Sequence, residues 1–210
     1  MTLSDGVRGN QVRVIAGSLR SRPLLAPAGM DTRPTADRLR ETLFNVLTQG
    51  AVDRVAGAAF LDLYAGSGAV GIEAVSRGAA SVTFVEQGPP ALAVLRKNLE
   101  NLGLRGGGIQ VEKRSVARFL RGLIELVDKP EATGFGVVFL DPPYELADEY
   151  ATTLGLLGGE AVGVLAAGAL VVVEHRKKSP LAERYGALVL VRVKEQGDAG
   201  LSFYEVQQQD

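Results

Sequence analysis

The sequence has no cysteine, no tryptophan and a single histidine, His175, among its 210 residues. Without cysteine, disulfides and cysteine-based metal sites are excluded, and one isolated histidine argues against a histidine metal cluster or a catalytic triad. No apolar run approaches the roughly 20 residues that span a membrane. Residues 1–20 also lack the long apolar stretch of a signal peptide. We therefore expect a soluble cytoplasmic protein that has no metal site.

The net charge of −1 hides an uneven distribution along the chain. Residues 1–40 hold seven arginines and three aspartates, a net charge of +4, whereas the rest of the chain sums to −5. A basic end on an acidic body suits phosphate binding, although a solvated charged surface has the same composition. The nucleic-acid contacts that we predict from this pattern are Arg20, Arg22, Arg33, Arg38 and Arg40.

Strand-like and helix-like segments alternate through most of the chain. Strands are predicted at 59–63, 82–85, 109–113, 137–140, 170–173, 188–193 and 203–206, and helices at 35–47, 70–77, 89–102, 116–127 and 147–165. Repeated β-α units predict an α/β, Rossmann-like fold, a mostly parallel twisted sheet with helices on both faces. The last two strands predict an antiparallel C-terminal edge hairpin. We expect one domain over 1–210, in which 1–50 is a basic extension with a short β-hairpin and a helix, and 51–210 is the core.

A glycine-rich turn joins the first of these strands to the following helix. Gly66, Gly68 and Gly71 allow a sharp turn and close approach of a ligand to a helix N-terminus, whose N–H groups are free. Glu86 ends the next strand, where a carboxylate can accept both hydroxyls of a ribose. The same spacing also fits a dinucleotide-binding fingerprint, so the turn alone does not distinguish a methyltransferase from an NAD(P)-binding oxidoreductase.

A second motif, Asp141-Pro142-Pro143-Tyr144, follows the apolar strand 137–140. The Asp141 carboxylate and the Pro142 carbonyl can accept the two N–H groups of an exocyclic base amine and stabilise the positive charge that develops on its nitrogen. The Tyr144 ring offers the base a stacking surface. We predict these four residues as the catalytic group. A proline-stiffened turn is the simpler interpretation, but it does not account for a tetrapeptide that follows both an apolar strand and the glycine turn.

With both motifs in place, the chain resembles class I (Rossmann-like) S-adenosylmethionine-dependent methyltransferases. More narrowly, it resembles the RsmD-type family of 16S rRNA guanine-N2 methyltransferases. The resemblance runs from about residue 12 to 206, and its segments are 33–45, 62–74, 76–79, 141–144, 197–198 and 201–204. Segment 33–45 is the most family-specific, because the other two motifs also occur in many amino-methyltransferases.

The resemblance implies that S-adenosylmethionine is the cofactor and that a guanine N2 in 16S rRNA, within the assembled or partly assembled small subunit, is the target. It implies that Gly66 and Gly68 line the methionine part of the cofactor, that Glu86 holds the ribose, and that Asp141 and Pro142 grip the amine. The cofactor-binding residues that we expect are Asp62, Tyr64, Ala65, Gly66, Ser67, Gly68, Gly71, Glu86, Ser115, Val116 and Asp141. We expect a monomer.

One position departs from the family pattern. Similar enzymes usually place an aspartate after the third strand to contact the adenine amine, and this chain has Ser115 there. A serine hydroxyl or a backbone group can still accept that hydrogen bond. Adenine recognition is therefore expected to differ here.

Three alternatives stay open at this point. An adenine-N6 methyltransferase of DNA or RNA shares the tetrapeptide, although the chain has little room for a separate target-recognition domain. An NAD(P)-binding oxidoreductase explains the glycine turn but has no use for Asp141. A non-catalytic RNA-binding module fits the basic end but not two intact motifs.

Overall fold

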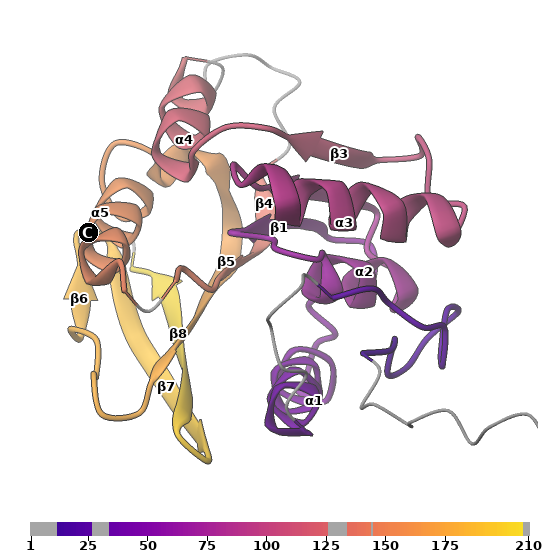
Figure 1. The fold of residues 1–210 in the computed structure, drawn as a ribbon. Helices are drawn as coiled ribbons and strands as arrows, with labels where there is room; N and C mark the ends of the chain where they lie inside the picture. The colour runs from indigo at the N-terminus through magenta and orange to yellow at the C-terminus, as the bar shows by residue number, and fades with distance from the viewer. Residues whose placement is uncertain (1–11, 27–33, 126–133, 144, 208–210) are drawn as a thin grey trace, which may run out of the picture.

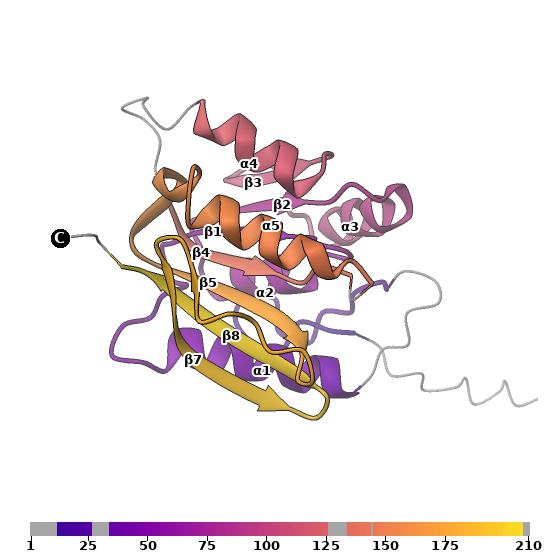
Figure 2. The same cartoon turned by 90° about the vertical axis from the view of Figure 1, so that its left-hand side faces the viewer.

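The structure is a computed structural model that describes residues 12–26, 34–125, 134–143 and 145–207. Eight strands form one sheet in the order β3-β2-β1-β4-β5-β8-β7-β6 (Figures 1 and 2). The strands are β1 Ala59–Leu63, β2 Ser81–Val85, β3 Ile109–Glu112, β4 Phe135–Leu140, β5 Leu165–Arg176, β6 Arg184–Tyr185, β7 Leu188–Gln196 and β8 Ala199–Val206. The first five are parallel, and β8 pairs antiparallel with both β5 and β7.

Helices cover both faces of the sheet, as predicted (Figure 1). They are α1 Pro34–Thr48, α2 Ala69–Ser76, α3 Pro89–Asn101, α4 Val116–Ile124 and α5 Ala147–Leu157, with a short 3₁₀ turn at Val162–Val164. Side chains alternate along each strand, so Phe60 belongs to the core under α1–α3, whereas Leu61 belongs to the core under α4 and α5. In the described part of the chain, no helix has the length and apolarity that a membrane span requires.

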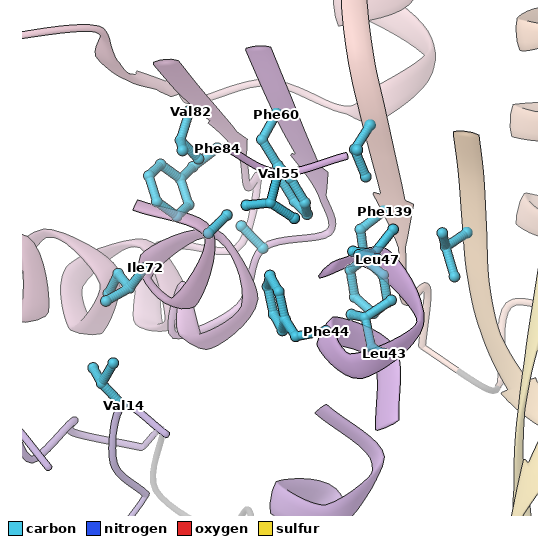
Figure 3. Packing of buried hydrophobic residues seen from close by; sticks show 14 of the residues in the cluster. Val14, Leu43, Phe44, Leu47, Val55, Phe60, Ile72, Val82, Phe84 and Phe139 are labelled. Atoms are coloured by element: carbon cyan, nitrogen blue, oxygen red, sulfur yellow. The ribbon is translucent and has the colours of Figure 1, made fainter. Parts of the chain in front are cut away.

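Aromatic packing fixes α1 against the sheet (Figure 3). The Phe44 and Phe60 rings are stacked with centroids 6.3 Å apart, and the guanidinium of Arg77 lies 4.9 Å from the Phe44 ring centre. Phe44 and Leu47 are fully buried in the same cluster as Val14 and Leu24 of the N-terminal segment. The described part of the predicted basic extension therefore shares a core with the Rossmann-like unit.

Buried polar side chains of α2 and α3 hold the N-terminal segment 12–26. Glu73 is fully buried and accepts the backbone N–H groups of Ile15 and Ala16 at 2.7 and 3.0 Å. Asn98 accepts the N–H of Leu25 at 2.8 Å and donates to the Leu25 carbonyl at 3.0 Å. The predicted β-hairpin is present here as a single antiparallel bridge between Arg13 and Pro23.

Two elements near the C-terminus differ from the prediction. The predicted helix 147–165 ends at Leu157, because Gly158 and Gly159 follow and a glycine-rich stretch favours a turn over a helix. Strand β5 is longer than the predicted 170–173, and the two-residue strand β6 was not predicted. The hairpin of β7 and β8 is confirmed, and its β8 lies inside the sheet rather than at its edge.

Candidate cofactor and target-amine site

Three parallel strands deliver the predicted site residues to one edge of the sheet. Leu63, the last residue of β1, is in register with Val85 of β2 and with Leu140 of β4. The residues that follow these strands therefore emerge side by side, as expected for a ligand site in a sheet of this kind. They are Tyr64, Glu86 and Asp141.

The glycine turn is tightly packed beneath the site. Gly68 has a φ of 81°, and a Cβ at this position would lie 2.3 Å from Cδ1 of Leu95, so a side chain would be both strained and crowded. Gly71 donates its N–H to the buried Asp62 carboxylate at 2.8 Å. Burial raises the pKa of Asp62 well above its ordinary value, and the nearby carboxylates of Asp141 and Glu86 raise it further. Asp62 thus anchors the turn from below.

Glu86 connects the glycine turn to the start of α3. One carboxylate oxygen accepts the N–H of Gly66 at 2.9 Å, and the other accepts the N–H of Gly88 at 2.6 Å. The side chain is half-buried and lines the cavity. Each carboxylate oxygen has a further lone pair, so a held and oriented Glu86 can still accept two hydroxyl groups.

Asp141 and Pro142 form the second half of the site. Asp141 is exposed on the cavity wall, and the protein packed around its carboxyl group raises its pKa to about 7. Pro142 is buried, and its carbonyl accepts a long hydrogen bond of 3.5 Å from the Tyr150 hydroxyl. Pro143 lines the cavity, and Tyr144 lies outside the described residues.

One cavity of about 660 Å³ joins these two halves. Of the predicted site residues, it is lined by Asp62, Tyr64, Ala65, Gly66, Ser67, Glu86, Val116, Asp141, Pro142 and Pro143. Gly68 and Gly71 shape the turn from beneath and are not part of the lining. The N–H groups of Gly66, Gly68 and Gly71 are all used within the protein, so the turn contributes a closely approaching backbone rather than free donors. This backbone and the Glu86 carboxylate beside it fit an adenosyl cofactor.

The Tyr64 side chain has a structural role, although the residue lines the cavity. Its hydroxyl donates to the Glu149 carboxylate at 2.6 Å and lies 2.7 Å from the Thr153 hydroxyl. Burial, and then the Glu149 hydrogen bond, raise the pKa of Tyr64 above its ordinary value. The Tyr64 ring therefore ties the glycine turn to α5.

Ser115 serves as the N-cap of α4. Its hydroxyl accepts the N–H of Arg118 at 3.4 Å, and the residue is not in the cavity lining. Arg114, one residue earlier, does line the cavity and pairs with Glu112 at 2.7 Å. Arg114 was not predicted from the sequence. The one available signal was its neighbour Ser115, which occupies the position where similar enzymes have an adenine-binding aspartate.

The predicted arginine face is divided by the fold. Arg20, Arg22 and Arg38 are exposed, and Arg22 donates to the Asn101 carbonyl at 3.3 Å. Arg33 lies outside the described residues. The prediction for Arg40 was wrong, because this side chain is only 7% exposed and donates inward, to the Arg13 carbonyl at 2.6 Å and to Asp37 at 3.0 Å. Arg40 braces α1 against the N-terminal segment and is not available to phosphate.

Comparison with known proteins identifies the family. Residues 12–205 match the sequence profile of a family described as Conserved hypothetical protein 95. The chain belongs to this family. The Ribosomal RNA small subunit methyltransferase D of Escherichia coli K12 is 37% identical to the chain over 197 residues, which cover 93% of this chain and 90% of that protein. The predicted resemblance to the RsmD-type family is thereby confirmed.

Solved structures agree with this membership. A hypothetical protein from Thermus thermophilus has a TM-score of 0.71 and 33% identity, covering 93% of this chain and 99% of that one. A SAM-dependent methyltransferase from Agrobacterium tumefaciens shares the fold, with a TM-score of 0.57 and 18% identity over 83% of this chain and 63% of that one. The predicted class I methyltransferase fold is confirmed.

Proposed function

We propose that this chain transfers a methyl group from S-adenosylmethionine to the exocyclic N2 of a guanine in 16S rRNA. The observation that carries the proposal is one cavity that holds two hydrogen-bond acceptors, on Asp141 and Pro142, beside the glycine turn and Glu86. Relatives that are named ribosomal RNA small subunit methyltransferases support an rRNA methyltransferase. The guanine-N2 target rests on the family resemblance of the sequence.

The cofactor's place follows from the residues present. Glu86 would accept the ribose hydroxyls, the backbone around Gly66 would approach the methionine part, and the side chain of Val116 would pack on the adenine. S-adenosylmethionine supplies a methyl group on a positively charged sulfur, an electrophile that an amine nitrogen can attack. The glycine turn and Glu86 would hold the cofactor in the cavity that Asp141 also lines.

Asp141 and Pro142 would make the amine reactive. The lone pair of an exocyclic amine is delocalised into the base, so the nitrogen is a poor nucleophile. The Asp141 carboxylate would accept one N–H and the Pro142 carbonyl the other, which favours a pyramidal nitrogen and stabilises its developing positive charge. As the N–C bond forms, the nitrogen holds one proton too many, and the Asp141 carboxylate, with a pKa of about 7, can take it up.

The sheet argues against the oxidoreductase alternative. A dinucleotide-binding fold continues 3-2-1-4-5-6 with parallel strands. Here the antiparallel β8 follows β5. Together with the family membership, this favours the methyltransferase over both the oxidoreductase and the non-catalytic module. The adenine-N6 alternative uses the same amine grip, so the product must distinguish it.

We further infer a cytoplasmic monomer that acts on 16S rRNA within the assembled or partly assembled small subunit. A base that reaches this cavity must leave its stack, which costs least in a single-stranded loop. Of the predicted arginines, Arg20, Arg22 and Arg38 are exposed and are the candidate phosphate contacts. Arg33 stays a prediction from the sequence.

The test is methylation of small subunits that lack the native modification, with methyl-labelled S-adenosylmethionine. Nucleosides from the digested RNA would be separated by mass spectrometry, and naked 16S rRNA would be run in parallel. Label in N2-methylguanosine is the expected result. Label in N6-methyladenosine would overturn the target base, and absence of label on any RNA, with a nicotinamide cofactor bound instead, would overturn the enzyme class.

A further inference from the structure

A second cavity, of about 240 Å³, lies between α5 and the loop that follows β5. We call it the α5–β5 cavity. Because β4 and β5 are parallel and Leu140 is in register with Val173, Asp141 follows the end of β4 beside Glu174 of β5, which continues to Arg176. His175 and Arg176 come next and line the cavity. It therefore lies at the same edge of the sheet as Asp141.

Tyr150 is shared between this cavity and the proposed amine site. Its side chain is buried, 8% exposed, and lines the α5–β5 cavity. Its hydroxyl donates to the Pro142 carbonyl at 3.5 Å. The pKa of Tyr150 is raised chiefly by burial and then by the charge of Asp141, as expected for close neighbours. One side chain thus separates the acceptors for the target amine from the second cavity.

The lining combines flat apolar surfaces with a cation. Tyr185, Pro180 and Leu181 supply the apolar part, and Arg176 and Ser179 supply polar groups. No carboxylate is among the described residues that line it. Tyrosine and proline surfaces stack on bases, and a guanidinium forks onto phosphate or stacks on a base. The chemistry suits one nucleotide of single-stranded RNA.

The cavity wall is preformed. The Tyr185 ring packs edge-on against Tyr204 with centroids 5.8 Å apart. The backbone N–H of Ala182 donates to the Tyr185 hydroxyl at 3.2 Å, and the Tyr204 hydroxyl donates to the Ala182 carbonyl at 2.8 Å. The N–H of Ser179 donates to the Arg176 carbonyl at 2.9 Å. A loop held in this way loses little conformational entropy when a ligand binds.

Other occupants fit less well. The larger cavity already holds Glu86 and the glycine turn, so the cofactor does not need the second one. Both ring nitrogens of His175 are engaged, with the Arg176 carbonyl at 2.9 Å and the Ser202 hydroxyl at 2.8 Å, which leaves neither for a metal ion. We propose that the α5–β5 cavity binds the nucleotide next to the target base. This proposal rests on the proposed function.

The test fills the cavity without touching Asp141. Ala151 is an exposed residue of α5 that lines the cavity, whereas its exposed neighbour Thr152 does not line it. We expect Ala151→Phe to raise the KM for RNA about tenfold, within the range for losing one stacked base, with KM for S-adenosylmethionine, kcat and Tm unchanged. Thr152→Phe is the matched control and should change none of them. Ser179→Phe fills the cavity from the opposite wall and should repeat the effect.

Binding of small-subunit RNA to the same variants, measured without cofactor, separates the possible failures. Weaker binding by both filling variants supports the cavity even if the wild type methylates no RNA, a result that would overturn the proposed function alone. If the wild type is active and both filling variants have the same KM for RNA as the wild type, the cavity proposal is overturned. A rise in the KM for S-adenosylmethionine, with that for RNA unchanged, also overturns it.

Discussion

The ends of β1 and β4 lie side by side, but they are built in opposite ways. After β1 the chain turns through glycines, and its N–H groups are used within the protein, that of Gly66 on Glu86 and that of Gly71 on Asp62. After β4 the chain turns through prolines, which have no N–H to donate and leave carbonyl oxygens free to accept. The first end is suited to surround a cofactor, and the second is suited to bind a group that carries two N–H donors.

The two carboxylates at these ends show the same contrast. Asp62 is buried and accepts a backbone N–H, so its role is to hold the turn. Asp141 is exposed on the cavity wall, and the protein packed around its carboxyl group raises its pKa to about 7. Both pKa values are raised and both residues line the cavity, yet Asp62 is 2% exposed and already accepts the Gly71 N–H, whereas Asp141 is exposed. A raised pKa therefore does not by itself identify the reactive group, and the geometry of the cavity does.

The largest effect is expected at the β4 end. Asp141→Ala removes one of the two acceptors for the amine and should lower kcat by about two to three orders of magnitude, as for loss of one group that stabilises a transition-state charge. Single-turnover methylation of small-subunit RNA would measure it. Unchanged RNA binding and a Tm no lower than that of the wild type are the controls, and a loss of less than tenfold would contradict the assigned role.

At the β1 end, the effect should appear in cofactor binding. Glu86→Gln replaces an acceptor oxygen by a donor amide facing the N–H of Gly66 or Gly88. Hydrogen bonds to a charged group contribute about 1.5–3 kcal/mol, so the KM for S-adenosylmethionine should rise roughly 10- to 100-fold while kcat changes little. Glu112→Gln is the control, because Glu112 pairs with Arg114 and does not line the cavity. An equal rise in both variants would refute the assignment.

The tight packing beneath the glycine turn should contribute to the unfolding free energy of the protein. A Cβ on Gly71 would lie 2.3 Å from Cε1 of the buried Phe84, so Gly71→Ala should cost about 1–3 kcal/mol of unfolding free energy. Gly155→Ala on α5 meets no atom within 4 Å and should stabilise the protein by about 0.5–1 kcal/mol. Denaturant unfolding would measure both, and a neutral Gly71→Ala would show that the turn is loosely packed.

Asp141 should also make stability and activity depend oppositely on pH. Its pKa of about 7 in the folded protein exceeds its ordinary value of 3.8, so the unfolded chain binds fewer protons between these values and stability falls as the pH rises through this window. Asp141→Asn should therefore have a higher Tm than the wild type at about pH 8, and the difference should vanish near pH 4. Wild-type kcat/KM should rise through pH 7, as the accepting carboxylate forms. A Tm difference that does not vary with pH would contradict the shift.

The smallest effect is expected at Ser115. Ser115 is the N-cap of α4, so Ser115→Ala should cost about 0.5–1 kcal/mol of unfolding free energy. It should leave the KM for S-adenosylmethionine unchanged. Thermal unfolding and the methylation assay measure these two quantities. A severalfold rise in that KM would instead support the direct adenine contact that the sequence predicted.

The sequence by itself determined the order of strands and helices and the grouping of the two motifs. Glu86 and Asp141 could be placed at one edge because the carboxyl ends of parallel strands meet there, whatever else the chain does. The glycine spacing and the strand before Asp141 are local signals. They can be recognised in the sequence without knowing which distant residues pack against them. These local signals did not distinguish S-adenosylmethionine from a nicotinamide cofactor. The antiparallel β8 and the family membership favour S-adenosylmethionine.

Only the tertiary structure decided the roles that depend on distant contacts. Arg40 is in a basic stretch of sequence, yet the fold buries it against the Arg13 carbonyl. Segment 12–26 has no strong periodicity, and it is held by Glu73 and Asn98, more than 50 residues away. The α5–β5 cavity likewise joins α5 to a loop beyond β5. Such contacts depend on which surfaces are brought together when the sheet forms, and residues near one another in the sequence carry no signal of that.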